Sequence, residues 1–131
     1  MGLIYVDSCL LIYVVENHPA FADRVRALLS TVDPERLAIS DLVRMECLVG
    51  PIKHGDLALQ RRYEAAFDEL APLSLPQAVF IQAAHLRARF TLKPPDALHL
   101  ACAQHHHCDG LWTNDTRLNQ AAHGLSRNAL A

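Results

Sequence analysis

The sequence lacks the features of a secreted or membrane-embedded protein. Its four cysteines, Cys9, Cys47, Cys102 and Cys108, form no CxxC pair, and a domain of this size needs no disulfide. Charged residues interrupt the apolar runs well before the roughly 18 residues that a membrane helix requires. Nothing before Asp7 resembles a secretory signal. We therefore expect a cytoplasmic protein with reduced thiols and no membrane association.

The chain also lacks an excess of positive charge. It has 12 Lys and Arg against 14 Asp and Glu, which gives a formal net charge of −2 at pH 7. This balance argues against a protein that coats nucleic acid by charge alone. It does not argue against a nuclease, because an acidic metal site itself lowers the total. A local basic rim can still form from residues that include Arg44, Lys93 and Arg117.

What the sequence does contain is a series of short apolar strands separated by amphipathic helices. Its 131 residues, 51% of them hydrophobic, are enough for one domain that buries about two thirds of its unfolded surface. Residues 3–6 predict a strand buried on both faces, and further strands are predicted at 37–40, 73–75 and 110–113. Helices are predicted between them, and this alternation is typical of an α/β fold with a parallel sheet and right-handed crossovers.

The apolar spacing also predicts where the helices begin, end and face. They are expected over residues 8–16, 19–31, 40–50, 56–70, 76–90 and from 95 onward. The third of these should end at Gly50 and Pro51, because a proline inside a helix removes a backbone donor. In the fifth, Phe80 and Ala84 should face inward together with Val79, Ala83 and Leu86.

Four acidic residues occupy positions that bring functional groups to one edge of such a sheet. Asp7 and Asp115 each follow a predicted strand, Asp96 lies in the first turn of a helix, and Glu46 lies on the apolar face of the helix that follows Ser40. Strand carboxyl ends and helix starts share one edge of a parallel sheet. The four carboxylates can therefore converge.

Each of these acids also has a purely structural interpretation. Asp7 can cap the following helix, and Asp96 can interact favourably with the dipole of its own helix. Glu46 can lie at the rim of the core or pair with an arginine, since a carboxylate on an apolar face needs a partner. Asp115 can belong to an ordinary Asx turn.

Converging carboxylates repel one another unless a cation lies between them. Oxygen ligands favour a hard cation such as Mg²⁺ or Mn²⁺, which in turn binds phosphate. The four acids together therefore indicate a metal-dependent phosphodiesterase. A response-regulator domain also gathers acids at strand ends, but it would need a lysine after a later strand, and none follows 110–113.

Three other features with reactive side chains, all cysteine or histidine, are present in the sequence. Cys9 lies beside the acids but has no evident base, so it is a poor candidate for a nucleophile. The tract His105 to His107, with Cys102 upstream, offers zinc ligands, although adjacent histidines at a helix end point in different directions. His99, one turn after Asp96, can face either the core or the site, and a packed or hydrogen-bonded role is expected.

The segments that carry these features are Val6-Asp7-Ser8, Ser40 to Glu46 with Gly50 after it, Pro95 to Ala101, and Thr113-Asn114-Asp115. In this order and spacing they resemble the PIN domain, specifically the VapC-type toxin ribonucleases of prokaryotic toxin-antitoxin pairs. The resemblance covers nearly the whole chain. It departs from the usual pattern at Cys9, which replaces a small polar residue, and at Leu118, which stands where an aromatic residue often follows the fourth acid.

The resemblance implies a single PIN domain over residues 1–131, folded as a three-layer α/β/α sandwich with a central parallel sheet of four or five short strands. It also implies an endoribonuclease whose acidic groove is filled by a cognate antitoxin. Asp7, Asp96 and Asp115 would hold Mg²⁺ or Mn²⁺, with Glu46 as a further ligand or as the group that deprotonates the attacking water. RNA cut in this way carries a 3′-hydroxyl and a 5′-phosphate.

The remaining expectations concern supporting residues and partners. Ser8, Thr113 and Asn114 are expected to orient the carboxylates, and Arg44, Lys93 and Arg117 to contact RNA. A homodimer is expected as well. The main alternative is a non-catalytic PIN-like module that binds RNA or a protein through a degenerate metal site.

Overall fold

The computed structural model describes residues 2–114, 118–122 and 124–130. Within these residues, five parallel strands form one sheet in the order β3-β2-β1-β4-β5. The strands are β1 (Ile4–Val6), β2 (Leu37–Ser40), β3 (Ala71–Leu73), β4 (Gly110–Thr113) and β5 (Ser126–Asn128). This confirms the predicted α/β class and the parallel sheet.

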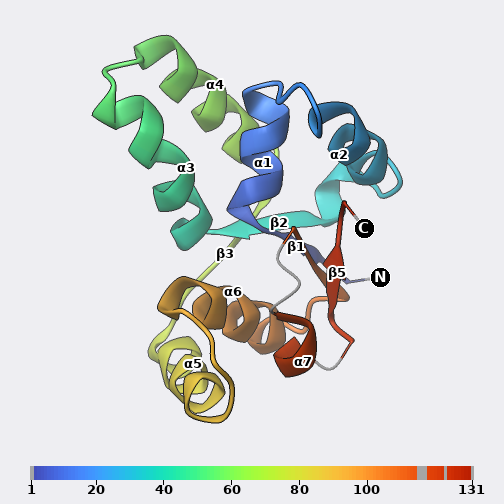
Figure 1. The fold of residues 1–131 in the computed structure, drawn as a ribbon, viewed down its shortest axis with the longest axis vertical. Helices are drawn as coiled ribbons and strands as arrows, with labels where there is room; N and C mark the ends of the chain where they lie inside the picture. The colour runs from blue at the N-terminus through green and yellow to red at the C-terminus, as the bar shows by residue number, and fades with distance from the viewer. Residues whose placement is uncertain (1, 115–117, 123, 131) are drawn as a thin grey trace.

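Helices cover both faces of the sheet, as the crossovers of a parallel sheet require. One layer contains α1 (Ser8–Val15), α2 (Ala22–Leu29), α3 (Asp41–Lys53) and α4 (Leu57–Asp68), and the other contains α5 (Gln77–Arg89), α6 (Pro94–His105) and α7 (Asn119–Ala122) (Figure 1). A 3₁₀ turn over Pro34–Arg36 leads into β2. The fold is therefore the expected three-layer sandwich. No helix among the described residues is both long and apolar enough to cross a membrane.

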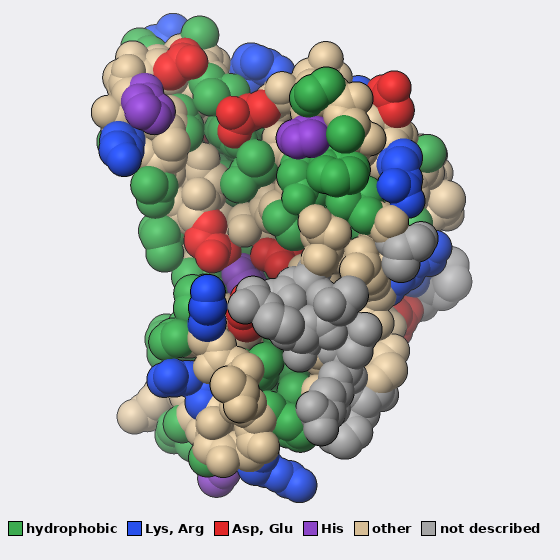
Figure 2. All heavy atoms as spheres, viewed as in Figure 1, with side chains coloured by type: hydrophobic (Ala, Val, Ile, Leu, Met, Phe, Trp, Pro, Cys, Tyr) green, Lys and Arg blue, Asp and Glu red, His purple; other side chains and the backbone are tan. Residues whose placement is uncertain are grey.

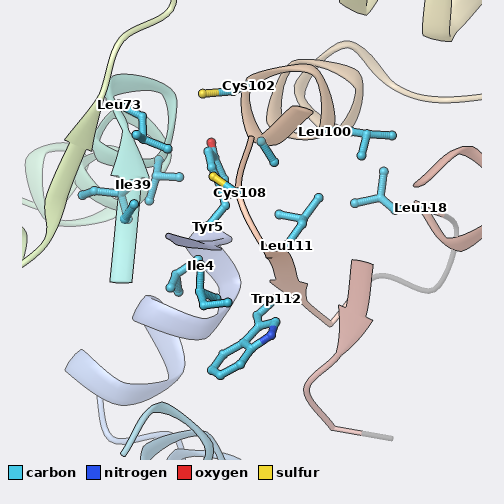
Figure 3. Close-up of a cluster of buried hydrophobic side chains, with 14 of the residues drawn as sticks. Ile4, Tyr5, Ile39, Leu73, Leu100, Cys102, Cys108, Leu111, Trp112 and Leu118 are labelled. Atoms are coloured by element: carbon cyan, nitrogen blue, oxygen red, sulfur yellow. The ribbon is translucent and has the colours of Figure 1, made fainter. Parts of the chain in front are cut away.

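The core is centred on β1 and β4, every residue of which is buried. Figure 3 shows Tyr5 and Leu111 of these strands with Leu100 of α6 and Leu118 around them. All four side chains are fully buried. Their continuous apolar sequences are typical of strands covered by helices on both faces.

The prediction that α3 ends at Gly50 and Pro51 is wrong. The helix continues to Lys53, and Pro51 is buried inside its last turn. A proline there removes only one intrahelical bond. The end of the helix is closed by other bonds, because the backbone N–H of His54 donates to the Gly50 carbonyl and that of Asp56 donates to the Pro51 carbonyl.

The predicted inward face of α5 is partly wrong. Val79, Ala83 and Leu86 are buried as expected, but Phe80 is 51% exposed and Ala84 is exposed. The buried residues follow one helical stripe, and each of the other two is rotated by about 100° from its buried neighbour. Apolar character alone therefore overestimated the width of the buried face.

The third strand begins two residues earlier than predicted. β3 covers Ala71–Leu73 instead of 73–75 and pairs with β2 through Ala38 with Ala71 and Ser40 with Leu73. Pro72 is tolerated in this strand because β3 lies at the edge of the sheet, where a missing donor leaves no ladder bond unmade on the outer side. β5, with the polar sequence Ser-Arg-Asn, carries no strand pattern and was not located from the sequence.

Candidate metal centre

Asp7 lies at the carboxyl end of β1, at the point where the strand passes into α1. Its backbone N–H donates to the Trp112 carbonyl, which extends the pairing of β1 with β4 by one residue. One carboxylate oxygen, Oδ1, accepts from the Ser8 backbone N–H at 2.7 Å, and Oδ2 accepts from the Thr113 hydroxyl at 2.7 Å. Asp7 is therefore the N-cap of α1 and also a buried carboxylate fixed from two sides.

Glu46 approaches Asp7 from α3, and a histidine lies between them. Oε1 of Glu46 is 2.6 Å from Nε2 of His99 on α6, and the same nitrogen is 3.6 Å from Oδ1 of Asp7. The His99 side chain is 2% exposed and the Glu46 side chain is 25% exposed. Glu46 is thus paired, as the apolar face required, but with a histidine and not with an arginine.

Asp7, Glu46 and His99 form a compact group of possible metal ligands. Each offers one ligand atom, and the three atoms lie within 4.8 Å of one another. Within the described ranges it is the one group of three or more such residues. Figure 2 shows acidic side chains and a histidine gathered in a hollow between the two layers of helices, with a basic side chain beside them.

Glu46 and His99, which share a hydrogen bond, shift each other's pKa. Burial favours the neutral form of Glu46, but the hydrogen bond from His99, the charge of His99 and a hydrogen bond from Ser8 outweigh it and lower the pKa of Glu46. Burial likewise opposes the charge of His99, but the Glu46 hydrogen bond and the charges of Asp7, Glu46 and Asp96 raise the pKa of His99. The pair is consequently stabilised as carboxylate and imidazolium.

The structure describes one of the other two predicted acids, Asp96, and places it less centrally. Asp96 is partly buried in the first turn of α6, and its charge acts on His99, although its carboxylate is not in the compact group. Asp115 lies outside the described residues, as does Arg117. The metal site can therefore be described from Asp7, Glu46 and His99, with Asp96 nearby.

The predicted supporting residues fall into two groups. Ser8 and Thr113 donate to Asp7, so both contact a candidate ligand directly. The Asn114 amide instead donates to the Tyr13 hydroxyl at 2.9 Å. Asn114 therefore positions α1 against the end of β4 and does not bond to Asp7.

The two described basic residues differ in their surroundings. Lys93 is exposed at the start of α6, in the turn that leads to Asp96. The Arg44 guanidinium lies 3.3 Å from Asp41 and stacks over the Phe67 ring at 5.2 Å. Lys93 is accordingly the more accessible of the two to a polyanion.

Among the described residues, Cys9 is not arranged as a nucleophile, and the histidine tract is not arranged as a metal site. Burial raises the pKa of Cys9 to about 12, so its thiol stays protonated and is a weak nucleophile. At the end of α6, His106 Nε2 lies 2.8 Å from the Ser74 carbonyl, and His107 has the left-handed φ of 54°. The described residues of this tract bring no three metal ligands together.

His99 was expected to be packed or hydrogen-bonded, and it is; the sequence left open whether it faces the core or the site, and the structure places it in the candidate site. The sequence carries a signal for it, because His99 lies three residues after Asp96 and helical residues at that spacing share a face. Tyr5, by contrast, was missed. Its hydroxyl contacts His99 Nδ1 at 2.6 Å, a contact between residues 94 positions apart that no local pattern encodes.

Comparison with known families gives one match over most of the chain. The family model described as the PIN domain matches residues 4–124. No protein with a curated function matches the chain significantly. The family match agrees with the resemblance drawn from the four acidic segments.

Solved structures share this fold over nearly the whole chain. A chain from a toxin-antitoxin complex of Klebsiella pneumoniae has 25% sequence identity and a TM-score of 0.80, with 98% of each chain covered. A chain of FitAcB from Neisseria gonorrhoeae is 19% identical with a TM-score of 0.82, covering 98% of this chain and 99% of that chain. A chain of VapBC2 from Rickettsia felis, solved with a promoter DNA fragment, is 17% identical with a TM-score of 0.77, covering 95% and 97%.

Proposed function

The chain belongs to the PIN domain family, and from this premise we propose that it is a metal-dependent endoribonuclease toxin neutralised by a cognate antitoxin. The observation that carries the proposal is the group of buried Asp7 and His99 with partly exposed Glu46 at the carboxyl edge of the sheet. Carboxylates from two separate elements converge there, although nothing in the fold requires two like charges to be adjacent. A single PIN domain over residues 1–131 would carry the activity.

The donor set of this group fits a divalent cation. Asp7 Oδ1 and Glu46 Oε1 are carboxylate oxygens, the ligand type that Mg²⁺ and Mn²⁺ prefer. Asp96, in the first turn of α6, and Asp115, after β4, would complete the ligand set. A cation bound here would act as a Lewis acid on the phosphodiester and lower the pKa of a water molecule.

The chain's own residues would fix the geometry of the reaction. Ser8 and Thr113 hold the Asp7 carboxylate through two hydrogen bonds, so that it need not reorganise when substrate binds. Glu46, with its lowered pKa, is ionised at neutral pH and can accept a proton from the attacking water. Lys93 lies at the start of α6, where it can contact a phosphate of the RNA.

The antitoxin partner rests on the similar structures. The Klebsiella pneumoniae structure is a toxin-antitoxin complex, and its chain covers nearly the same length as this one. An antitoxin segment would occupy the hollow that contains the candidate metal ligands and so exclude RNA. The expected homodimer stays a proposal.

The test is cleavage of RNA by the purified chain with Mg²⁺ or Mn²⁺, with excess chelator, and with Asp7→Asn. We expect chelation and the substitution each to reduce the rate roughly a hundredfold or more, because a Lewis-acid cation contributes several kcal/mol to the transition state. The products should carry 5′-phosphate ends. Asp23→Asn, which removes a fully exposed carboxylate on α2, is the matched control and should leave the rate unchanged.

Two results would contradict the proposal in different ways. A cyclic phosphate product would show that the neighbouring 2′-hydroxyl attacks and that the carboxylates do not direct a water. A folded chain that neither cleaves RNA nor binds Mn²⁺ in calorimetric titration would favour the non-catalytic binding module.

A further inference from the structure

A continuous chain of buried polar side chains leads from the interior of the protein to Glu46. The Ser40 hydroxyl is 2.7 Å from the Tyr5 hydroxyl, which is 2.6 Å from Nδ1 of His99. Nε2 of His99 is in turn 2.6 Å from Oε1 of Glu46. Ser40 and Tyr5 are fully buried and His99 is 1% exposed, so water does not compete for the two bonds among these three residues.

This series of hydrogen bonds joins the three elements that supply the described candidate ligands. Tyr5 lies in β1, two residues before Asp7, and His99 lies in α6, three residues after Asp96. Ser40 ends β2 and is the N-cap of α3, the helix that carries Glu46. These hydrogen bonds therefore link the elements that set the positions of the carboxylates relative to one another.

The direction of the bond between His99 and Glu46 follows from its partners. If the imidazole is neutral, Nδ1 can accept from the Tyr5 hydroxyl, which itself accepts from Ser40, and Nε2–H donates to Glu46. If the imidazole is charged, both nitrogens donate and Tyr5 donates to Ser40. The opposite neutral tautomer would set a nitrogen lone pair against a carboxylate oxygen at 2.6 Å. In both favourable arrangements the Nε2 lone pair is occupied by a proton.

We propose that His99 is a positioning residue that holds Glu46 for cation binding, with Tyr5 holding His99, and that His99 is not itself a cation ligand. This inference deepens the proposed function and rests on it, since it requires Glu46 to act at a cation site. Asp7 does not compete for the His99 proton, because its Oδ1 lies 3.6 Å from Nε2, beyond hydrogen-bond distance.

Glu46 needs such support more than Asp7 does. Its side chain is 25% exposed and has three rotatable bonds, whereas Asp7 is shorter, buried and fixed by Ser8 and Thr113. The hydrogen bond from His99 selects one position for the Glu46 carboxylate before the cation arrives. Loss of hydrogen-bond partners behind a metal ligand typically weakens metal affinity by about ten- to a hundredfold.

The experiment measures dissociation constants for Mn²⁺ by calorimetric titration of the purified chain and four variants. Tyr5→Phe removes one hydroxyl and keeps the ring, and His99→Leu removes the donor. Both should weaken Mn²⁺ binding by about ten- to a hundredfold. His99→Gln keeps an amide N–H that can reach Glu46, and it should restore affinity to within a few-fold of the wild type.

Tyr63→Phe is the matched control. Tyr63 is also fully buried, and its hydroxyl also donates to a carboxylate, that of Glu16, but this pair belongs to α4 and the end of α1. The substitution removes the same atom from a similar environment. It should lower the thermal unfolding temperature without changing the Mn²⁺ dissociation constant.

Comparing Mg²⁺ with Zn²⁺ binding distinguishes a positioning role of His99 from a role as a metal ligand. If His99 only positions Glu46, His99→Leu should weaken Mg²⁺ and Zn²⁺ binding by a similar factor. If His99 is a ligand, the loss should be much larger for Zn²⁺, which favours nitrogen ligands, and His99→Gln should not restore it. That result would overturn the proposal.

The remaining outcomes are equally decisive. If His99→Leu does not fold, Tyr5→Phe decides by itself, and unchanged Mn²⁺ affinity in that variant would overturn the inference. A wild-type chain that binds Mn²⁺ and cleaves RNA while the variants match it would overturn the inference alone. A folded wild-type chain that binds no Mn²⁺ would overturn the proposed function as well.

Discussion

Helices α3 and α6 both contribute to the candidate site, but they are packed very differently. α6 buries six of its residues, Ala97, His99, Leu100, Ala101, Cys102 and Ala103. α3 is one residue longer and also rich in apolar side chains, but it buries only Val43, Cys47 and Pro51. Met45, Val49 and Ile52 of α3 are 53%, 54% and 58% exposed.

The difference follows from what covers each helix. α6 lies between the sheet and α5, so that two of its sides are covered (Figure 1). Among the described residues, α3 packs mainly against α4, α1 and β2, and its apolar side chains Met45, Val49 and Ile52 lie on a surface that these elements leave exposed. The site therefore joins a firmly packed element, which carries His99, to a less buried one, which carries Glu46.

The largest expected change in the free energy of unfolding comes from a core substitution in α6. Leu100 of α6 is fully buried in the core, so Leu100→Ala should lower the free energy of unfolding by about 2 to 5 kcal/mol through lost transfer energy and a residual cavity. Urea denaturation followed by circular dichroism measures this. A loss below about 1 kcal/mol would mean that α6 is not packed more firmly than α3.

An intermediate effect is expected at the contact between the two helices, in metal-free protein with chelator present. The pKa of Glu46 is lowered from 4.5, so its contribution to stability is present above pH 4.5 and is lost as the pH falls. The pKa of His99 is raised from 6.5, so its contribution is complete below pH 6.5 and is lost as the pH rises. The pair should stabilise the fold most between these values.

The measurement is the difference in unfolding free energy between wild type and Glu46→Gln as a function of pH, which cancels the titration of other groups. We expect a difference of about 1 to 3 kcal/mol between pH 4.5 and 6.5, decreasing on both sides. A difference that does not vary with pH would show that the two side chains do not form a charged pair.

The smallest effect is expected on the open face of α3. Ile52→Ser should change the free energy of unfolding by no more than about 0.5 kcal/mol, because the side chain is more than half exposed at 58%. Urea denaturation at a series of protein concentrations measures it. A loss above about 1 kcal/mol that grows with protein concentration would show that this face is covered by a second copy in solution.

Much of the fold could be predicted because its signals are local. The apolar run of β1 followed by Asp7, and the strand Gly110–Thr113, were predicted because a strand buried on both faces needs continuous apolar sequence. The errors arose where packing outweighed a local rule. Pro51 is accommodated in the last turn of α3, Phe80 faces away from the core, and Pro72 lies in an edge strand.

Some features of the candidate site could likewise be predicted from the sequence, and others could not. The sequence by itself determined that Asp7 ends a strand, that Asp96 opens a helix and that Glu46 lies within one, since strand and helix patterns fix where a residue stands along its own element. Only the tertiary structure decided that His99 bonds to Glu46, 53 positions away, and that Tyr5 bonds to Ser40, 35 positions away. These contacts depend on how β1, α3 and α6 pack together. Periodicity within one element carries no information about which residues of other elements it will contact.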